Sequence, residues 1–294
     1  MLSIEKIVLG TVQFGLRYGI NNRSGQPDKP AVFDILDKAG RGGITTLDTA
    51  EDYGTAQDII GEYILERGQQ SERFRVISKI SAEVTQREQL RANIERTLET
   101  LHIPGLEAYL FHRYENYKLF PELVSEMNIL KEENKIRKIG VSIYTNEELE
   151  EVIDSEDIQI VQLPLNLLDN LSFKDGLLEK AKRAGKEIHA RSIFLQGLLF
   201  MDAHRIPAYL SALKPAFKAI HHLASAAGVT VESLALNYVV NNPLVDKALI
   251  GVDTKDHLTK SLNCLKDVIS PEVFASVDAI KVDSAVLLNP TNWK

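Results

Sequence analysis

Residues 75–112, RVISKISAEVTQREQLRANIERTLETLHIPGLEAYLFH, contain the pattern that decides the fold. Two short runs rich in apolar and β-branched residues, 75–79 and 108–112, flank a stretch with helical periodicity. The apolar residues of that stretch are spaced by four, four and three positions, as one face of an α-helix requires; they are Leu90, Ile94, Leu98 and Leu101. The segment therefore predicts a strand, a helix and a second strand in succession.

The same alternation recurs along the whole chain. The expected strands are residues 6–9, 44–48, 75–79, 108–112, 136–142, 158–162, 187–192 and 247–250. Successive strands begin about 30 residues apart, the size of one strand-helix unit. The last interval is about twice as long and is expected to hold two helices, near 213–227 and 231–241. The alternation predicts parallel strands joined by right-handed crossovers. We expect one domain over residues 1–294: an α/β protein with a (β/α)8 TIM barrel, an extra helix before the last strand and a C-terminal tail.

Glycine and proline positions support the helices. Pro30 suits a first helical turn, Gly40 is expected to cap that helix at its end, and Gly68 and Gly228 follow two others. A doubly wound sheet is the alternative fold, but it requires a glycine-rich phosphate turn after the first strand. Residues 10–15, GTVQFG, lack the G-x-G-x-x-G spacing, and residues 40–43, GRGG, follow a helix rather than a strand. The barrel is therefore favoured.

Composition excludes several functional classes. The chain has 294 residues, with 34 Lys and Arg against 41 Asp and Glu, which gives a net charge of −7. An acidic chain is a poor partner for nucleic acid, and no apolar run approaches the ~20 residues of a membrane span. The single cysteine, Cys264, allows no internal disulfide and is expected to pack among apolar neighbours. The seven histidines are scattered, so no metal site is expected. Without a signal-like start, the expected location is the cytoplasm.

Polar residues at the carboxyl ends of barrel strands are candidates for the site. Asp48, Lys79 and His112 end three neighbouring strands, and Tyr53 follows Asp48 by five residues. A tyrosine, with an ordinary pKa of ~10, is a weak acid until a nearby cation favours its phenolate. We expect Lys79 to be that cation, Asp48 to hold it, and His112 to hydrogen-bond a carbonyl oxygen. This set favours reduction of a carbonyl by hydride from a bound cofactor.

These residues lie in motifs that resemble those of the aldo-keto reductase superfamily. The motifs are LGTVQFG (9–15), LDTAEDYG (47–54), SK (78–79), LFHR (110–113), GVS (140–142), VQLPLN (161–166), ARSIFLQGLL (190–199) and IGVDTKDHL (250–258). The resemblance implies a barrel, NADPH or NADH as hydride donor, and a catalytic tetrad of Asp48, Tyr53, Lys79 and His112. The ARSIFLQGLL variant resembles a bacterial branch linked with sugar and cell-surface glycan metabolism, which implies a small carbonyl substrate derived from a sugar.

The resemblance also implies a cofactor site and a substrate site. The expected cofactor residues are Gly10, Thr11, Asp48, Ser142, Gln162, Arg191, Ser192, Phe194, Gln196, Gly197, Gly251, Thr254, His257 and Ser261. We expect the substrate to enter a mouth lined by Phe14, Arg17, Tyr18, Arg113, Tyr114 and Trp293, with Trp293 carried on a terminal segment. The arginines would attract an anionic substrate, and ordinary solvated charges are the other interpretation.

Departures from the family pattern leave some choices open. Ile143 stands where the family usually has Asn, Arg191 where many members have a stacking Tyr, and Ile193 where Pro is usual. His257 and Ser261 replace a frequent Arg and Asn at the adenosine end, so NADP(H) is expected with NAD(H) as the alternative. Only about five residues precede the first strand, too few for the family's usual hairpin.

Two other functions remain open from the residues alone. One is a cofactor-sensing binding protein with weak catalysis, because Ile143 and Arg191 alter the surroundings of the nicotinamide. The other is a Schiff-base aldolase with Lys79 as nucleophile, which the neighbouring Tyr and Asp disfavour. The residues do not indicate an oligomeric state.

Overall fold

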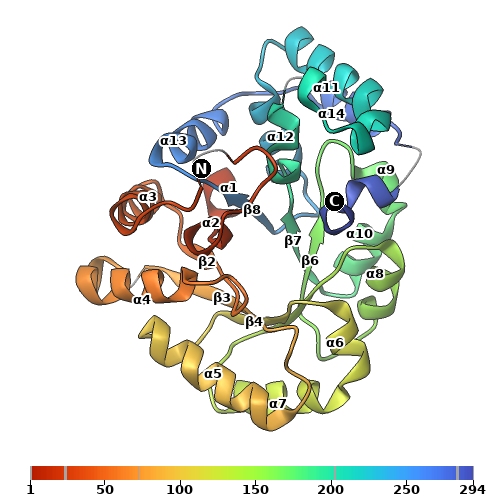
Figure 1. The fold of residues 1–294 in the computed structure, drawn as a ribbon. Coiled ribbons are helices and arrows are strands. Elements are labelled where there is room, and N and C mark those ends of the chain that lie inside the picture. Colours follow the sequence, from red (N-terminus) through yellow and green to blue (C-terminus); the bar gives the residue numbers. More distant parts are fainter. Residues whose placement is uncertain (1, 23–24, 72, 202, 283–284, 294) are drawn as a thin grey trace.

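The computed structural model describes residues 2–22, 25–71, 73–201, 203–282 and 285–293. Within these ranges, eight parallel strands form a closed barrel in the order in which they occur along the chain, and pairing of the first strand with the eighth completes the circle (Figure 1). The strands are β1 (Ile7–Gly10), β2 (Thr46–Asp48), β3 (Arg75–Ile80), β4 (Ala108–Phe111), β5 (Ile139–Ser142), β6 (Ile160–Pro164), β7 (Glu187–Arg191) and β8 (Lys247–Gly251). The expected (β/α)8 barrel is confirmed, and an open doubly wound sheet is excluded.

Helices surround the strands on the outside (Figure 1). They are α1 (Leu2–Glu5), α2 (Val12–Gly15), α3 (Lys29–Arg41), α4 (Ala56–Arg67), α5 (Arg87–Leu101), α6 (Tyr114–Leu119), α7 (Pro121–Glu132), α8 (Asn146–Ile153), α9 (Leu171–Lys174), α10 (Leu177–Arg183), α11 (Lys214–Ala226), α12 (Val231–Val240), α13 (Lys255–Cys264) and α14 (Pro271–Asp278). Short 3₁₀ segments lie at Gly68–Gln70, Leu195–Phe200, Ala203–Arg205, Ala208–Leu213, Ala285–Leu288 and Pro290–Asn292. The extra helix before the last strand is α11, and α14 begins the C-terminal tail.

Helix α5 shows how the apolar stripe specifies packing. Leu90, Ile94 and Leu101 are fully buried, and Leu98 is partly buried against the same core. Spacing of three and four residues brings these side chains to one face of the helix, and burying an apolar side chain of this size stabilises the fold by roughly 1.5–3 kcal/mol. The helix lies outside the strands that precede and follow it, as the sequence predicts.

The end of helix α3 differs from the expectation. Gly40 lies inside the helix, which continues to Arg41. Gly43 adopts the left-handed conformation, with φ of +92°, and the amide of Ile44 donates to the carbonyl of Ala39. This is the arrangement that closes a helix through a glycine just beyond its end. The prediction that Gly40 caps the helix was wrong, because the C-cap is Gly42 and the left-handed residue after it is Gly43.

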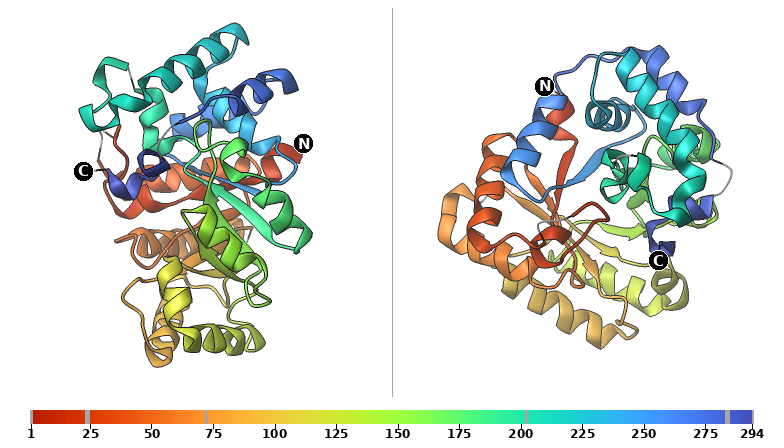
Figure 2. Two further views of the ribbon diagram at one scale, coloured as in Figure 1. Left: turned by 90° about the vertical axis from the view of Figure 1, so that its right-hand side faces the viewer. Right: turned by 45° about the horizontal axis from the view of Figure 1, so that its top comes forward.

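The two faces of the barrel are distinguished by the termini. Helix α1 directly precedes β1, so the N-terminus lies at the side where strands begin. Figure 2 (left) shows the C-terminus on the opposite side of the barrel, the side where strands end. Tail residues therefore lie near the face that carries the site in barrels of this type.

No single helix in the described part of the chain is long and apolar enough to cross a membrane. The segments Ala208–Ala226 and Val231–Val240 reach the required length and hydropathy only when taken together as a bent pair.

Candidate active site

The site lies one layer above the packed interior of the barrel. A small buried cluster inside the barrel consists of Ile77, Ala108, Leu110 and Ile160. Because side chains two residues apart on a strand face the same way, the residues that follow these strand positions by two also face inward. They are Lys79, His112 and Gln162. Asp48 joins them because it pairs with Ile77 in the barrel register. Strand periodicity alone therefore brings four polar side chains to one place.

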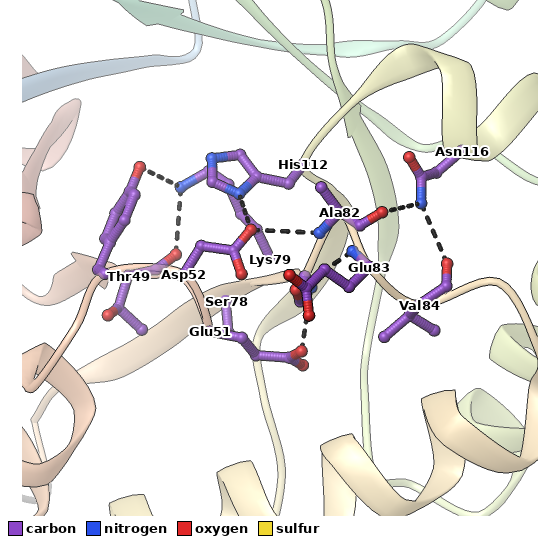
Figure 3. A network of polar contacts seen from close by, with 12 residues as sticks. Thr49, Glu51, Asp52, Ser78, Lys79, Ala82, Glu83, Val84, His112 and Asn116 are labelled. Carbon is purple, nitrogen blue, oxygen red and sulfur yellow. Dashed lines mark hydrogen bonds and ion pairs between the residues drawn. The ribbon is translucent and has the colours of Figure 1, made fainter.

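Lys79 is the centre of the site. Its Nζ donates hydrogen bonds to the carboxylate Oδ1 of Asp48, to the carbonyl of Thr49 at 3.1 Å and to the Tyr53 hydroxyl at 3.4 Å. The side chains of Lys79 and Asp48 are only 2% and 3% exposed, which makes this ion pair part of the core. Figure 3 shows the lysine reaching the carbonyl of Thr49. The geometry brings together the lysine, aspartate and tyrosine that the sequence predicts as partners.

Burial and the neighbouring charges have opposite effects on the pKa values of these groups. Burial disfavours the Lys79 ammonium, but Asp48 and Tyr53 outweigh this effect, so the pKa of Lys79 is raised. Burial also raises the pKa of Tyr53 above its ordinary value, although Lys79 acts to lower it. Asp48 acts on the Tyr53 pKa in the raising direction. Lys79 therefore acts in the expected direction, but burial, together with the Asp48 carboxylate, outweighs it, so the pKa of Tyr53 is raised in the free protein.

His112 follows β4 and contacts both Tyr53 and a residue that the sequence analysis did not identify. Its ring packs edge-on against Tyr53, with ring centroids 5.6 Å apart and an interplanar angle of 80°. Its Nδ1 lies 3.3 Å from Oδ2 of Asp52, in the loop after β2 (Figure 3). Burial lowers the pKa of His112 despite the neighbouring carboxylate. The imidazole is therefore neutral at pH 7.

Two adjacent carboxylates fasten the loop that carries Tyr53. Glu51 accepts hydrogen bonds from the amide of Ser81 at 3.0 Å, from Asn93 at 2.7 Å and from the Tyr109 hydroxyl. Asp52 accepts one from the amide of Ala82 at 3.2 Å. Burial raises the pKa of Glu51, whereas the hydrogen bond from His112 lowers the pKa of Asp52 to about 2. Both acids stand in LDTAEDYG, but nothing local in that motif indicates which residues they bind.

Several expected cofactor residues surround Asp48. The hydroxyl and amide of Thr11 both donate to the Asp48 carbonyl, at 3.0 and 2.9 Å. Gln162 donates from Nε2 to Asp48 Oδ2 at 2.9 Å, so in this structure its amide holds the aspartate. Ser142 ends β5 beside Gln162 in the register, and Gly10 pairs with both Asp48 and Gly251. These residues gather at one edge of the site.

Arg191 ends β7 with its guanidinium stacked on Tyr144, 4.0 Å from the ring centroid. It donates to the carbonyl of Ile143 at 2.8 Å and to Oγ of Ser192 at 3.3 Å. Its Nε is buried and has no hydrogen-bond partner among the described residues. The stacking partner that the sequence analysis missed is thus Tyr144, and Arg191 keeps one donor free.

The loop after β7 is bonded to the loop after β1. Gln196 donates from Nε2 to the Tyr18 hydroxyl at 2.9 Å, and its carbonyl accepts from the amide of Ile20 at 3.1 Å. Ser192, Gln196 and Gly197 all have positive φ, so this loop turns tightly and presents backbone toward the opposite loop. An expected cofactor residue and an expected substrate residue therefore hold each other. Phe194, in the same loop, is partly buried, and its ring packs at a tilt against Phe200.

The helix after β8 begins with a side-chain cap. Thr254 accepts a hydrogen bond at Oγ1 from the amide of His257 at 3.1 Å, and His257 is itself exposed. Ser261 is buried, and its hydroxyl donates to Glu232 of α12 at 2.8 Å. The structure therefore brings Thr254 and His257 to the helix N-terminus but directs Ser261 into the packing between two helices.

The expected substrate residues separate into two groups. Phe14 is fully buried in the core, and Tyr114 is buried with its hydroxyl bonded to Glu151 of α8. The structure therefore does not bring Phe14 or Tyr114 to an open mouth, because packing against helices takes up their side chains. Arg17, Tyr18 and Arg113 are exposed. Trp293 is half-buried, and its indole donates to the carbonyl of Leu287 at 3.0 Å, within the tail.

The fold and the site together define a class: a TIM barrel whose strand ends carry a tyrosine, a buried lysine-aspartate pair and a histidine. A model of the Aldo/keto reductase family matches residues 6–282. The chain therefore belongs to the aldo/keto reductase family, which comprises oxidoreductases that use nicotinamide cofactors and small carbonyl substrates.

Three known proteins illustrate the relationship. Glyoxal reductase of Bacillus subtilis (strain 168) is 24% identical over 251 residues, which cover 85% of this chain and 83% of the relative. NADH-specific methylglyoxal reductase of Escherichia coli (strain K12) is 24% identical over 226 residues, covering 67% and 69%. The solved structure of a provisionally named 2,5-diketo-D-gluconic acid reductase B has a TM-score of 0.72 at 18% identity, covering 98% of this chain and 91% of the other.

The residues at the strand ends fit a nicotinamide cofactor. Three buried polar atoms there have no partner among the described residues: Oε1 of Gln13, Oγ1 of Thr49 and Nε of Arg191. A Cβ at Gly251 would lie only 2.5 Å from the Gln13 side chain, so the glycine leaves room for this amide. Unpartnered buried polar atoms are costly, and a polar ligand would satisfy them. Gln13 was not among the expected residues, although it lies in the quoted LGTVQFG motif.

Proposed function

We propose that the chain is an NAD(P)H-dependent reductase that converts an aldehyde or ketone to the alcohol, with Tyr53 as general acid. The observation that carries this proposal is the buried Lys79 ammonium, which bonds both Asp48 and the Tyr53 hydroxyl. We include a sugar or sugar-derived carbonyl in the substrate class, on the resemblance of the 190–199 motif. One domain over residues 1–294 and a cytoplasmic location, with which the single free cysteine agrees, complete the proposal.

Each residue has a distinct task in this reaction. The raised pKa of Tyr53 keeps its hydroxyl protonated at neutral pH, ready to donate to a carbonyl oxygen. A bound nicotinamide cofactor supplies the hydride. As the proton leaves Tyr53, the Lys79 ammonium stabilises the developing phenolate at short range, where burial strengthens the attraction. Asp48 keeps Lys79 charged and fixed, and Gln162 holds the other carboxylate oxygen.

The proposed cofactor is NADP(H), with NAD(H) as the alternative. Thr254 and the first amides of α13 form a helix N-terminus, which favours phosphate groups. Lys255 begins this helix and is half-exposed, although Asp34 lies 3.6 Å from its ammonium and weakens its field. The exposed arginines Arg17 and Arg113 add positive charge for an anionic substrate.

A cofactor titration followed by a substrate screen tests the proposal. NADPH and NADH are titrated separately by fluorescence, and loss of nicotinamide absorbance is then followed with aldehydes, ketones and sugars. Binding of one nucleotide with turnover of at least one carbonyl supports the reductase. Tight binding without oxidation across the whole panel would contradict it and favour a cofactor-sensing protein.

Gly15, which lies against the backbone of Tyr53, provides a test of whether the position of Tyr53 controls the reaction. A Cβ at Gly15 would lie 1.7 Å from the Tyr53 carbonyl oxygen and 2.5 Å from the Ala56 amide nitrogen. Because backbone atoms cannot yield like a flexible side chain, Gly15→Ala must displace the Tyr53 loop. We expect turnover to fall by about 100-fold or more, since a shift of about 1 Å in a catalytic group costs that much.

Gly185→Ala is the matched control for Gly15→Ala. Unlike Gly15, Gly185 has a φ that is unfavourable for alanine, +79°, but a Cβ there meets no atom within 4 Å. It should cost about 1 kcal/mol of stability and leave turnover unchanged. Wild-type turnover in Gly15→Ala would show that the loop position does not control the reaction.

A further inference from the structure

A groove of about 580 Å³ lies on the outer side of the barrel, lined by residues of α6, α7 and α8. These helices follow β4 and β5 and are neighbours on one side of the molecule (Figure 1). The lining begins with Tyr114, just after β4, and ends with Asp157, just before β6. Sites for small molecules have volumes of roughly 300–1,000 Å³, so the groove is large enough to hold one.

The segment that lines the groove carries the whole net charge of the protein. Residues 114–157 contain 12 Asp and Glu against 5 Lys and Arg, a net charge of −7, whereas the other 250 residues contain 29 of each sign. Within this segment, 146–157 (NEELEEVIDSED) has seven acids and no base. The buried Lys186 is within electrostatic reach of Asp154 and Asp157 and offsets part of their charge. The negative field is therefore strongest beside the groove, and the complementary ligand is a cation.

The walls of the groove combine aromatic rings with carboxylates. Tyr114 and Tyr117 pack against each other at a tilt, with ring centroids 6.1 Å apart. Glu151 accepts a hydrogen bond from the Tyr114 hydroxyl, and Asp157 accepts one from Asn128 at 2.7 Å. The Glu151 side chain is 50% exposed and Asp157 is half-buried. Since a carboxylate has about four lone-pair sites, both can accept further hydrogen bonds.

Lys118 shows which chemical group these walls accept. Its Nζ donates to both carboxylate oxygens of Glu151, at 2.9 and 2.7 Å, and lies 5.7 Å from the centroid of the Tyr114 ring. An ammonium group on an alkyl stem thus uses the carboxylate and the aromatic face together. The Lys118 side chain is 54% exposed, and an exposed ion pair of this kind contributes little stability. A ligand ammonium can therefore take its place.

We propose that the groove binds a linear aliphatic polyamine, with one ammonium group at Glu151, another at Asp157 and the alkyl chain along Tyr114 and Tyr117. An organic cation is favoured over a metal ion, because the described residues contain no group of three or more His, Cys, Asp or Glu side chains that could hold a metal. This site is separate from the proposed reductase reaction and does not depend on it.

Calorimetric titration of the full, cofactor-free chain with spermidine in 0.15 M NaCl tests the site. The screening length is then about 8 Å, so distant charges contribute little. We expect one site with a Kd below about 100 μM, weakened about 10-fold or more by Glu151→Gln combined with Asp157→Asn. No saturable binding would overturn the proposal.

Glu147→Gln combined with Glu150→Gln is the matched control for the loss of two charges. Both residues are exposed on α8 but do not line the groove. We expect the Kd of this control to stay within about twofold of the wild-type value, because screening isolates charges that the ligand does not touch. Equal weakening by the two double variants would show diffuse attraction to an acidic surface and would contradict a defined site.

Lys118→Met is expected to act in the opposite direction. It frees Glu151 and the Tyr114 ring for the ligand, so affinity for spermidine should rise by about three- to tenfold. Lys180→Met, which removes an exposed lysine of α10 outside the groove, should leave the affinity unchanged. A gain of affinity cannot come from a damaged groove, so this variant also guards against misfolding. Unchanged or weaker binding in Lys118→Met would refute the role of Glu151.

Two competitors determine the chemical class of the ligand. Trilysine carries ammonium groups on a peptide backbone, and Mg²⁺ carries charge without an alkyl chain. Weaker competition by both supports a polyamine. If trilysine displaced spermidine at lower concentrations than spermidine itself requires, the occupant would be a basic protein segment. If Mg²⁺ did so, the groove would recognise charge alone, and in either case the proposed class would be wrong. Because no measurement uses turnover, failure of the reductase function leaves this result unaffected.

Discussion

Replacing Tyr53 by phenylalanine is expected to lower the turnover of carbonyl substrates by about 10²- to 10⁴-fold, the usual contribution of a positioned proton donor. The ring would remain, so its edge-on packing against His112 is kept, and only the hydroxyl that bonds Lys79 at 3.4 Å is lost. Cofactor affinity should therefore stay within about threefold. Steady-state kinetics and a fluorescence titration measure the two quantities on the same preparation.

Tyr63→Phe is the control for loss of a tyrosine hydroxyl. Tyr63 is also buried, but it lies on α4 and donates to Asp37 at 2.9 Å, away from the strand ends. Loss of the Tyr63 hydroxyl should lower the free energy of unfolding by about 0.5–1.5 kcal/mol, while turnover stays near the wild-type value. If Tyr53→Phe kept a tenth or more of the activity with several carbonyl substrates, Tyr53 would not be the proton donor.

The second large effect is on stability. Lys79→Met should lower the free energy of unfolding by about 3–5 kcal/mol, because it leaves the Asp48 carboxylate buried without its cation. The side chains of Lys79 and Asp48 are only 2% and 3% exposed, so water does not reach the carboxylate to take the place of the ammonium. This burial is the reason for the large expected loss of stability. Among the described residues, only Gln162 would still donate a hydrogen bond to that carboxylate, at 2.9 Å. Urea denaturation, with the slope checked for a cooperative transition, gives the change.

A double replacement tests whether the uncompensated charge is the cause. Asp48→Asn combined with Lys79→Met removes both charges and keeps the side-chain sizes, so the double variant should lose less than the sum of the two single changes. Lys29→Met provides the surface comparison, because Lys29 pairs with Glu62 and Glu66 while all three are strongly exposed. It should change stability little. Strict additivity in the double variant would show that the pair is not coupled.

The pKa of Lys79 sets the pH range of this contribution. Because the folded pKa is raised above the ordinary lysine value of about 10.5, the stabilisation is fully present below that value. It is lost only as the pH rises through the folded pKa. The stability difference between wild type and Lys79→Met should therefore stay constant from about pH 6 to 9 and shrink in strongly alkaline solution. A difference that disappears near neutral pH would contradict the raised pKa.

The sequence alone was sufficient for the barrel because its signals are local and repeated. All eight expected strands occur within three residues of the expected bounds, and α11 and α12 lie where the long interval before β8 predicted two helices. The sequence also sufficed to identify Asp48, Lys79 and His112 as candidates, because each lies at the end of a strand. The spacing of two residues above Ile77 and Leu110 then brings Lys79 and His112 to one side.

Contacts between loops could not be predicted in this way. The hydrogen bonds of Asp52 to His112, Gln162 to Asp48 and Gln196 to Tyr18 join positions 60 to 178 residues apart. A loop has no periodicity that indicates its direction, so its partners depend on how neighbouring loops fold over the barrel end. Burial of Phe14 was missed for a similar reason, because its orientation depends on α2, a helix of only four residues.

The sequence by itself determined the order of strands and helices, and with it the barrel and the set of polar residues at the strand ends. The physical reason is that the pattern of apolar residues along the chain specifies which face of each strand and helix is buried. Only the tertiary structure decided that burial raises the Tyr53 pKa, that Gln162 holds Asp48, and that Asp52 contacts His112. Those properties depend on distances and desolvation between elements far apart in the chain, which no local pattern encodes.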